Sequence, residues 1–379
     1  MKWELKKLIK VKLLWLFLAV FLFLNMYQIR QMDRLISAPL DGHDTLLEQI
    51  QGLITDEKIA YVTESLQEVT DAIASGQAQP GEYDPERVTG YAYGDQYEFQ
   101  YFYDELFYCY SYEAEIDQIL QRAREAKQLY EESGNQTEAE HCRLILETYE
   151  GRALPYYDEM DQIERYLSYD GSALFVLLFL ILSLPGLIFR DSSEGMAGVI
   201  AVSEKGKDAY FYTKSMAALV WAAGVALLFH LQDFWLFGLP SRFDALRQPL
   251  YAIESSWLGM FSGSAGVFCL LRFIGCLLFY WCAGQGILLL AYWVRRPMGT
   301  ALLMIAAIGL LAFLAYREQS VFNPIGALAL FAQQQTFSAV MLAGRAYPAY
   351  WVNLLCCGGY ALALLLLFGI SAKKRPKRR

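Results

Sequence analysis

Six stretches of this chain are apolar over close to the 20 residues that a helix needs to cross about 30 Å of hydrocarbon. Because hydrocarbon offers no partner to backbone N–H and C=O groups, such stretches cross it as helices. A chain that is 55% hydrophobic and 19% charged is also too apolar for an ordinary soluble protein. The sequence therefore predicts an all-α integral membrane protein with six transmembrane helices, at Leu13–Tyr27, Ser172–Phe189, Ser215–Leu231, about Val267–Val294, Met298–Tyr316 and Tyr350–Ile370.

Lysine and arginine residues gather at alternate ends of these spans. If the amino terminus is cytoplasmic, odd-numbered spans leave the cytoplasm and even-numbered spans return. Every strong basic cluster then lies on the cytoplasmic side, as the positive-inside bias requires. These clusters are the lysines of residues 1–12, Arg190 with Lys205, Lys207 and Lys214, Arg295 with Arg296, and the tail KKRPKRR. We therefore expect a multi-pass protein of a bacterial plasma membrane, with both termini in the cytoplasm.

The amino-terminal residues 1–12 intersperse five lysines with Trp3, Leu5, Leu8 and Ile9. This pattern is typical of a short helix that lies on the membrane surface, so residues 1–30 are expected to form an interfacial helix followed by the first span. A cleaved signal peptide is the alternative. An uncleaved anchor is favoured, because NMYQIRQMD after the span offers no A-x-A-like cleavage site.

Residues 31–170 differ in composition from the rest of the chain. They hold about 31 Asp and Glu against about 9 Lys and Arg, and the topology predicts them to form a large helical extracytoplasmic domain between the first two spans. One helix face steps by three and four residues, and Thr55 is its expected N-cap. The apolar residues of this face are Ile59, Val62, Leu66, Val69 and Ile73, and further stripes fall within 116–130 and 142–149.

The same domain contains a tyrosine-dense stretch from Tyr91 to Tyr112. Tyrosine combines a large apolar ring with a polar tip, so these side chains are expected to cover a pair of helices, with a partner surface as the alternative. Cys109 and Cys142 also lie here. Sequence spacing alone does not show whether they form a disulfide.

Two apolar segments are too broken to be counted as spans. Residues 321–344 contain Asn323-Pro324 and the run 333–335 of glutamines. If this segment crossed the membrane, the basic tail would lie outside, so we expect a re-entrant or interfacial hairpin whose backbone is buried in protein or faces water. Residues 254–266 are expected to dip into the outer leaflet in the same way.

On this topology residues 190–214 form the one substantial internal loop. Asp191 and Glu194 stand three apart before an apolar run, which is typical of a helix N-terminus, and Gly206 suits a left-handed C-cap. A capped amphipathic helix resting on the inner leaflet explains most of these residues. It does not explain Gly195 and Gly198, each of which destabilises a helix by about 1 kcal/mol relative to Ala. Another protein or a neighbouring span is therefore expected to approach the backbone there.

The loop contains the pattern Glu194-x3-Gly198, then Ser203, then Gly206-Lys207, with Lys214 opening the next span. This pattern resembles the loop between the second and third spans of ABC-2-type transporter permeases, a family that commonly has Arg where Lys207 stands. The resemblance extends to the basic start, the insert after span one, the six-span order and the broken segment at 323–324. It covers all of the chain except the insert.

The resemblance implies that residues 171–379 are the core of a permease that moves substrate outward. ATP with Mg²⁺ would be hydrolysed by a separate cytoplasmic ABC ATPase subunit, since the chain has no GxxxxGK[ST] phosphate loop. A second permease copy or a paralogue would complete the path, and no cofactor would bind this chain directly. Residues 191–207 would be the coupling helix. The implied coupling residues are Glu194, Gly195, Gly198, Ser203, Gly206, Lys207 and Lys214.

Polar residues inside the predicted spans are the other candidate site residues. Arg272, Gln285 and Asn353 are candidates for the translocation path, because intramembrane polar groups mark functional sites by default. The alternatives are that Arg272 extends to the interface and that Gln285, Asn353 and also Asn25 hydrogen-bond between helices.

Other classes of function find little support in the sequence. The three histidines are scattered, the seven cysteines show no CxxC spacing, and no nucleophile motif is present, so we expect neither a metal site nor an enzyme. Nucleic-acid binding has no support. The rival hypothesis is a membrane sensor or scaffold whose acidic domain binds a ligand or protein. The sequence does not indicate the substrate.

Overall fold

The computed structural model describes residues 2–35, 43–76, 93–193, 206–318 and 320–374. It is mostly helical, and six of its helical segments are long and apolar enough to cross a membrane. They confirm all six predicted spans, so the chain is a multi-pass membrane protein. Their bounds are Lys12–Met32, Asp161–Asp191, Tyr210–Leu236, Ala265–Val294, Pro297–Glu318 and Ala349–Ser371.

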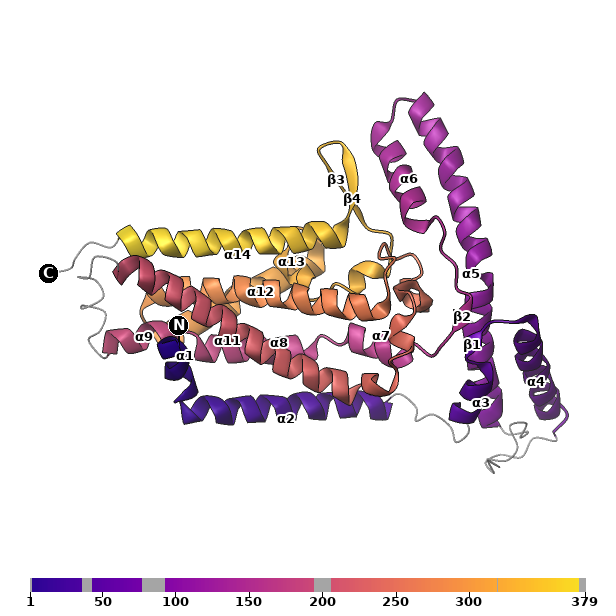
Figure 1. Cartoon of the computed structure of the whole chain (residues 1–379), viewed down its shortest axis with the longest axis horizontal. Coiled ribbons are helices and arrows are strands. Elements are labelled where there is room, and N and C mark those ends of the chain that lie inside the picture. Colours follow the sequence, from indigo (N-terminus) through magenta and orange to yellow (C-terminus); the bar gives the residue numbers. More distant parts are fainter. Residues whose placement is uncertain (1, 36–42, 77–92, 194–205, 319, 375–379) are drawn as a thin grey trace.

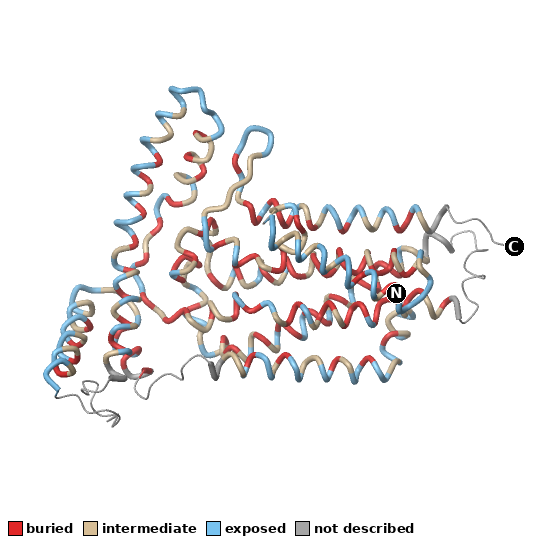
Figure 2. The backbone as a smooth tube through the Cα atoms, turned by 180° about the vertical axis from the view of Figure 1, so that it is seen from behind, coloured by how far each residue is buried: buried red, intermediate tan, exposed pale blue. Residues whose placement is uncertain are grey.

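The spans pack side by side into one bundle (Figure 1). Helix α12 (Ala265–Val294) lies at its centre and packs against α8 (Gly171–Ser183), α11 (Gly206–Leu236), α13 (Pro297–Glu318) and α14 (Ala349–Lys374). Burial is concentrated along the inside of the bundle, while the outer helices α2 (Lys12–Leu35), α13 and α14 have many exposed residues (Figure 2). Their exposed apolar side chains suit contact with lipid.

The second span consists of three short helices in line. These are α7 (Asp161–Ser168), α8 and α9 (Gly186–Ser193). Pro185 separates α8 from α9, because a proline lacks the N–H that would continue the helical hydrogen bonding. The carbonyl of Leu187, the second residue of α9, lies close to α11 and accepts a hydrogen bond from Lys214.

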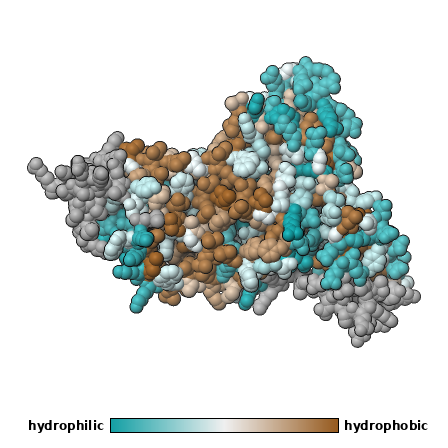
Figure 3. Space-filling model, viewed as in Figure 1, coloured by the Kyte–Doolittle hydropathy of each residue, from teal (hydrophilic) through white to brown (hydrophobic). Residues whose placement is uncertain are grey.

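The insert between the first two spans is helical, as predicted. It contains α3 (His43–Ile50), α4 (Asp56–Ala74), α5 (Tyr93–Glu132) and α6 (Gln136–Tyr149), with two short paired strands, β1 (Gly52–Leu53) and β2 (Tyr156–Tyr157). The predicted cap on α4 is present, since Thr55 Oγ1 accepts a hydrogen bond from the Lys58 amide at 3.3 Å. Val62 and Val69 of the predicted apolar stripe are buried. Figure 3 shows the insert as a hydrophilic body beside the hydrophobic bundle.

The segments between spans three and four, and between five and six, contain no spanning helix among their described residues. Residues 237–264 form four 3₁₀ turns, Leu239–Ser241, Ala245–Arg247, Leu250–Ala252 and Glu254–Ser256. Residues 320–348 form two more 3₁₀ turns, Pro324–Ala327 and Ala332–Gln334, and the hairpin of β3 (Ala339–Leu342) with β4 (Arg345–Pro348). The turn of this hairpin is left-handed at both Ala343 and Gly344. The segment is thus a folded connection packed on α12 and α14.

The two ends of the bundle differ in character. The insert and both of these connections lie at one end, whereas α1 (Lys2–Ile9), α9 and the start of α11 lie at the other (Figure 1). Arg295 and Arg296, between α12 and α13, also lie at the end opposite the insert, because successive spans are antiparallel. The lysines of α1, Arg190, Lys214, Arg295 and Arg296 therefore lie at the bundle end farthest from the insert.

Candidate functional site

A buried charge cluster joins α1, α9 and α11 at the bundle end opposite the insert. Its members are Glu4, Lys7, Asp191 and Lys214. The Lys214 side chain is 1% exposed, and its Nζ lies 2.5 Å from Asp191 Oδ2 and donates to the Leu187 carbonyl at 2.5 Å. The same ammonium donates to Glu4 Oε2. Lys214 is thereby neutralised by two carboxylates from two other helices.

Lys7 completes this charge cluster from the side of α1. Its Nζ pairs with Asp191 Oδ1 and lies 3.2 Å from Glu4 Oε1. Burial opposes the charge of Lys7, but the hydrogen bonds from Lys7 to Asp191 and Glu4 outweigh it and raise the pKa of Lys7. Arg190 adds a hydrogen bond to the Lys7 carbonyl. Two lysines and two carboxylates thus hold the amino-terminal helix against both flanks of residues 194–205.

The predicted coupling residues are only partly visible in the structure. Glu194, Gly195, Gly198 and Ser203 lie outside the described residues. Gly206 and Lys207 open the backbone of α11. Lys214 is inside the bundle, so it holds the base of the loop together and does not present its charge to a partner.

Sequence reasoning missed Glu4 and Asp191 as partners of Lys214, and Lys7 as the second cation of the cluster. One signal was present: Glu4 is the sole acidic residue among the five lysines of residues 1–12. An acid in that position is unfavourable on an anionic lipid surface and indicates a contact with protein.

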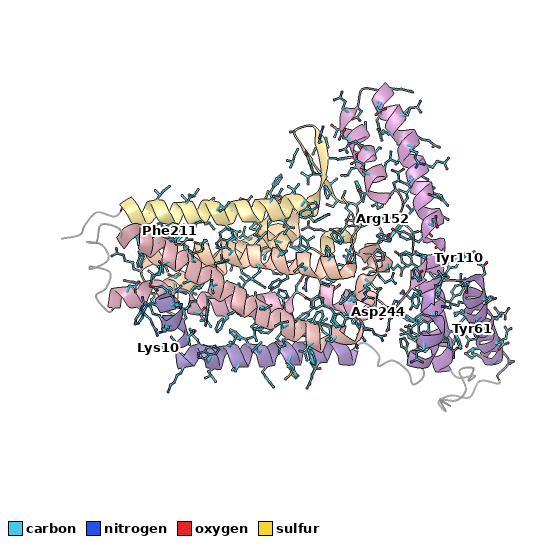
Figure 4. The ribbon with its side chains drawn as sticks, in the orientation of Figure 1. Lys10, Tyr61, Tyr110, Arg152, Phe211 and Asp244 are labelled. Atoms are coloured by element: carbon cyan, nitrogen blue, oxygen red, sulfur yellow. The ribbon has the colours of Figure 1, made fainter. Side chains whose placement is uncertain are left out.

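The insert is fastened to the bundle through Arg152, which Figure 4 shows between the two bodies. Arg152 is buried, donates to the Gly259 carbonyl at 2.9 Å and lies over the rings of Tyr149 and Tyr251, at 4.7 and 4.6 Å from their centroids. The ring of Tyr112 stacks on Tyr251 at 5.2 Å. We call these four residues the Arg152 latch.

The latch corrects the expected role of the tyrosine-dense stretch. The hydroxyl of Tyr108 donates to the Tyr251 carbonyl, and that of Tyr149 to the Leu258 carbonyl, each at 2.6 Å. Tyr108 and Tyr112 of the stretch, together with Tyr149 at the end of α6, hold the insert on the connection between spans three and four. The two residues of the stretch therefore do not only cover a helix pair. The open question of a disulfide is also answered, because Cys109 and Cys142 are both free.

A second polar cluster at the insert end centres on His43. Its Nδ1 lies 2.6 Å from Glu98 Oε2 and its Nε2 lies 3.0 Å from Glu159 Oε1. Hydrogen bonds to Glu159 and Glu98 raise the pKa of His43 to about 10. Burial opposes ionisation of Glu159, but His43 and Arg242, whose Nη2 is 2.7 Å from Glu159 Oε2, lower the pKa of this carboxyl.

We expect the insert to become less stable as pH rises from about 6.5, the ordinary histidine pKa, to about 10, the pKa of His43. A raised pKa contributes stability that is fully present below the unfolded value and is lost as the pH passes the folded value. Each charge-assisted hydrogen bond contributes about 1.5–3 kcal/mol. Thermal unfolding of the full chain against pH measures the effect. His43→Gln should flatten the profile and the matched control His141→Gln, on α6, should not; identical profiles for both variants would contradict the assignment.

The structure does not unite the candidate path residues into one site. Arg272 is 2% exposed, donates to the Tyr169 carbonyl and to Asp170 Oδ1 at 3.3 Å, and so is held by protein. Gln285 follows 13 residues later on α12, about 20 Å along the helix; it is buried and its side-chain atoms have no partner among the described residues.

Asn353, the third candidate, hydrogen-bonds within the protein. Its Nδ2 donates to the carbonyls of Val321 and Asn323, each at 2.8 Å. These bonds hold the connection between spans five and six against α14. Asn353 therefore does not make the hydrogen bond between helices that was the alternative, but a bond to the backbone of a connection.

Within the part of the chain that the structure describes, no group of three or more His, Cys, Asp or Glu side chains is placed to hold a metal ion. No family model, no curated protein and no solved structure matches this chain.

Proposed function

We propose that this protein is the membrane-spanning subunit of an ABC-2-type exporter, which moves substrate outward while a separate subunit hydrolyses ATP. The proposal draws on the loop pattern from Glu194 to Lys214 and on the six-span bundle. The observation that carries it furthest is the buried charge cluster. A cluster that bonds α1, α9 and α11 together at the base of the loop gives that loop a stiff attachment to three helices.

The orientation follows from the distribution of basic residues. Arg295, Arg296, the lysines of α1 and Lys374 at the end of α14 belong to the bundle end opposite the insert. The positive-inside bias assigns this end to the cytoplasm and the insert to the outside of a bacterial plasma membrane. The loop at 190–214 then faces the compartment that contains ATP.

In the proposed mechanism, residues 191–207 seat in the ABC ATPase, which holds ATP and Mg²⁺. Closure of the ATPase displaces this loop. Asp191 and Lys214 flank the loop and pair with each other, and Lys214 also pairs with Glu4 of α1. The displacement therefore moves α9, α11 and α1 as one unit. A second copy or a paralogue of this chain provides the other wall of the path.

The test is association with a co-encoded ABC ATPase. The double variant Glu194→Ala/Gly198→Leu should abolish co-purification of the ATPase with the detergent-solubilised permease, because it removes a charge and adds a bulky side chain at a glycine of the loop. Glu125→Ala/Glu132→Ala, on the exposed face of α5, is the matched control and should bind normally. Unchanged association and transport in the loop variant would refute the proposal.

One observation favours the alternative of a sensor or scaffold. The Arg152 latch joins the insert to the connection between spans three and four through buried contacts. A conformational change that a ligand causes in the insert would therefore be transmitted to the bundle. A neighbouring gene for an ATPase with a phosphate loop favours export, whereas one for a kinase or regulator favours sensing.

A further inference from the structure

A buried polar network links three spans near the insert end of the bundle. Asn25 of α2 donates to Asp233 Oδ1 at 2.7 Å and to Gln232 Oε1 at 3.1 Å, both on α11. Tyr169, between α7 and α8, donates its hydroxyl to Asn25 Oδ1 at 2.7 Å. Asn25, Tyr169 and Asp233 are each at most 3% exposed. Asn25 thus uses its amide and its carbonyl to fix α2 against both neighbours.

Asp233 is the acidic member of this network, and it forms no direct ion pair with a described residue. Its Oδ2 has no hydrogen-bond partner among the described residues. Ser172 also interacts with the carboxylate, but it is neutral and makes no hydrogen bond to Oδ2. The other oxygen is bound by a neutral amide. Several kcal/mol are required to keep an ionised carboxylate in apolar surroundings without a charged partner.

The groups around Asp233 do not provide that partner. Arg272 of α12 is the nearest cation, but its Nη2 is bonded to the Tyr169 carbonyl and to Asp170 Oδ1. His230, one turn earlier on α11, packs edge-on against Phe273 at 5.1 Å and is 7% exposed. The remaining titratable neighbours are a thiol and phenols, which are uncharged near neutral pH: Cys276, Tyr280, Tyr166 and Tyr169.

We propose that Asp233 is a proton-binding site within the helix bundle. In the packing described, Oδ2 takes a proton from water and forms an O–H bond, and the carboxylate becomes a neutral carboxylic acid. Oδ1 remains the acceptor for Asn25. Asp233 stands about one turn from the end of α11, Leu236, so the proton exchanges with water at the insert end. The proposal is independent of whether an ATPase drives the protein.

Burial, and not the bond to Asn25, favours the neutral form. Asn25 joins α2, a span with few buried residues, to α11, and its N–H binds a carboxylate more strongly than a carboxylic acid. This bond therefore favours the ionised form, whereas burial without an ion pair favours the protonated one. The proposal is that burial outweighs the bond.

Infrared difference spectroscopy of the purified full chain tests the proposal. The wild type at neutral pH should show the carbonyl band of a protonated carboxylic acid, and the band should shift in D₂O. Asp233→Asn, which replaces the acid with a neutral isostere, should remove the Asp233 component of the band and leave the component of Glu105, whose pKa burial raises to about 8. The matched control Asp117→Asn, on the exposed face of α5, should retain both components. A wild-type spectrum that Asp233→Asn leaves unchanged would overturn the proposal.

A second variant covers the case in which Asp233→Asn does not fold. Asp233→Glu keeps a titratable acid and should move the protonated-carboxyl band, whereas Asp117→Glu should not. The unfolding temperature of Asp233→Asn should match that of the wild type near neutral pH. It should not change with pH through protonation of residue 233. A band that does not move in Asp233→Glu refutes the site even without the asparagine variant.

Discussion

Replacing Lys214 by Met is expected to reduce the stability of the folded bundle by about 3–5 kcal/mol, the typical effect of removing one partner of a buried ion pair. Methionine keeps the length of the side chain but not its charge. Asp191 and Glu4, whose side chains are 1% and 13% exposed, would then share Lys7 as their one remaining cation in this cluster. Thermal unfolding of the detergent-solubilised chain and the yield of monodisperse protein measure the loss.

The control for this prediction is Lys12→Met, at the exposed start of α2, which should change the unfolding temperature little. The double variant Lys214→Met/Asp191→Asn removes one buried positive and one buried negative charge. It should recover part of the stability, because fewer buried charges are left without a partner. If the Lys214→Met and Lys12→Met variants unfold at the same temperature, the cluster does not hold the helices together.

The fold was predictable from the sequence wherever local pattern determines structure. Each span is a continuous apolar run, and a helix is the form in which such a run can cross hydrocarbon alone. The α4 helix was also predictable, because Thr55 and the apolar stripe from Ile59 to Ile73 lie within one segment. Neither prediction needed knowledge of which distant segments meet.

The charge cluster was not predictable because its partners are far apart in sequence. Glu4 and Lys214 are separated by 210 positions, and no local period links them. The abundance of lysine in residues 1–12 indicated a lipid-facing helix, and that composition hid the inward-facing pair Glu4 and Lys7. A charge that is rare in its surroundings, such as Glu4 among lysines, is the more informative residue.

The intramembrane polar residues illustrate the same limit. Hydropathy marks Arg272 and Asn353 as unusual within their spans, but it does not show what they touch. In the structure Arg272 donates to a backbone carbonyl and to the carboxylate of Asp170, and Asn353 donates to backbone carbonyls. Asp233 attracted no attention in the sequence because it lies two residues beyond the predicted third span, Ser215–Leu231, and inside the longer span of the structure, Tyr210–Leu236. Its importance comes from burial, which only the packed bundle creates.

Replacing Arg152 by Met is expected to loosen the insert from the bundle while both remain folded. The guanidinium contributes a charge-assisted hydrogen bond to the Gly259 carbonyl and two cation–π contacts. Together these are of order 3 kcal/mol. The methionine keeps the apolar stem, so the change tests the charged head and not the packing volume. Amide hydrogen exchange should quicken in residues 250–259 and at the end of α6 near Tyr149, and stay unchanged in α12.

Arg143→Met on the exposed side of α6 is the matched control. Arg143 pairs with Glu140 at 2.9 Å and Glu147 at 2.5 Å, but its side chain is 30% exposed, and surface pairs of this kind contribute about 1 kcal/mol or less. Loss of the Arg143 guanidinium should leave amide hydrogen exchange at residues 250–259 as in the wild type. Equal protection at 250–259 in the two variants would mean that the tyrosine hydroxyl bonds to Tyr251 and Leu258 hold the insert without Arg152.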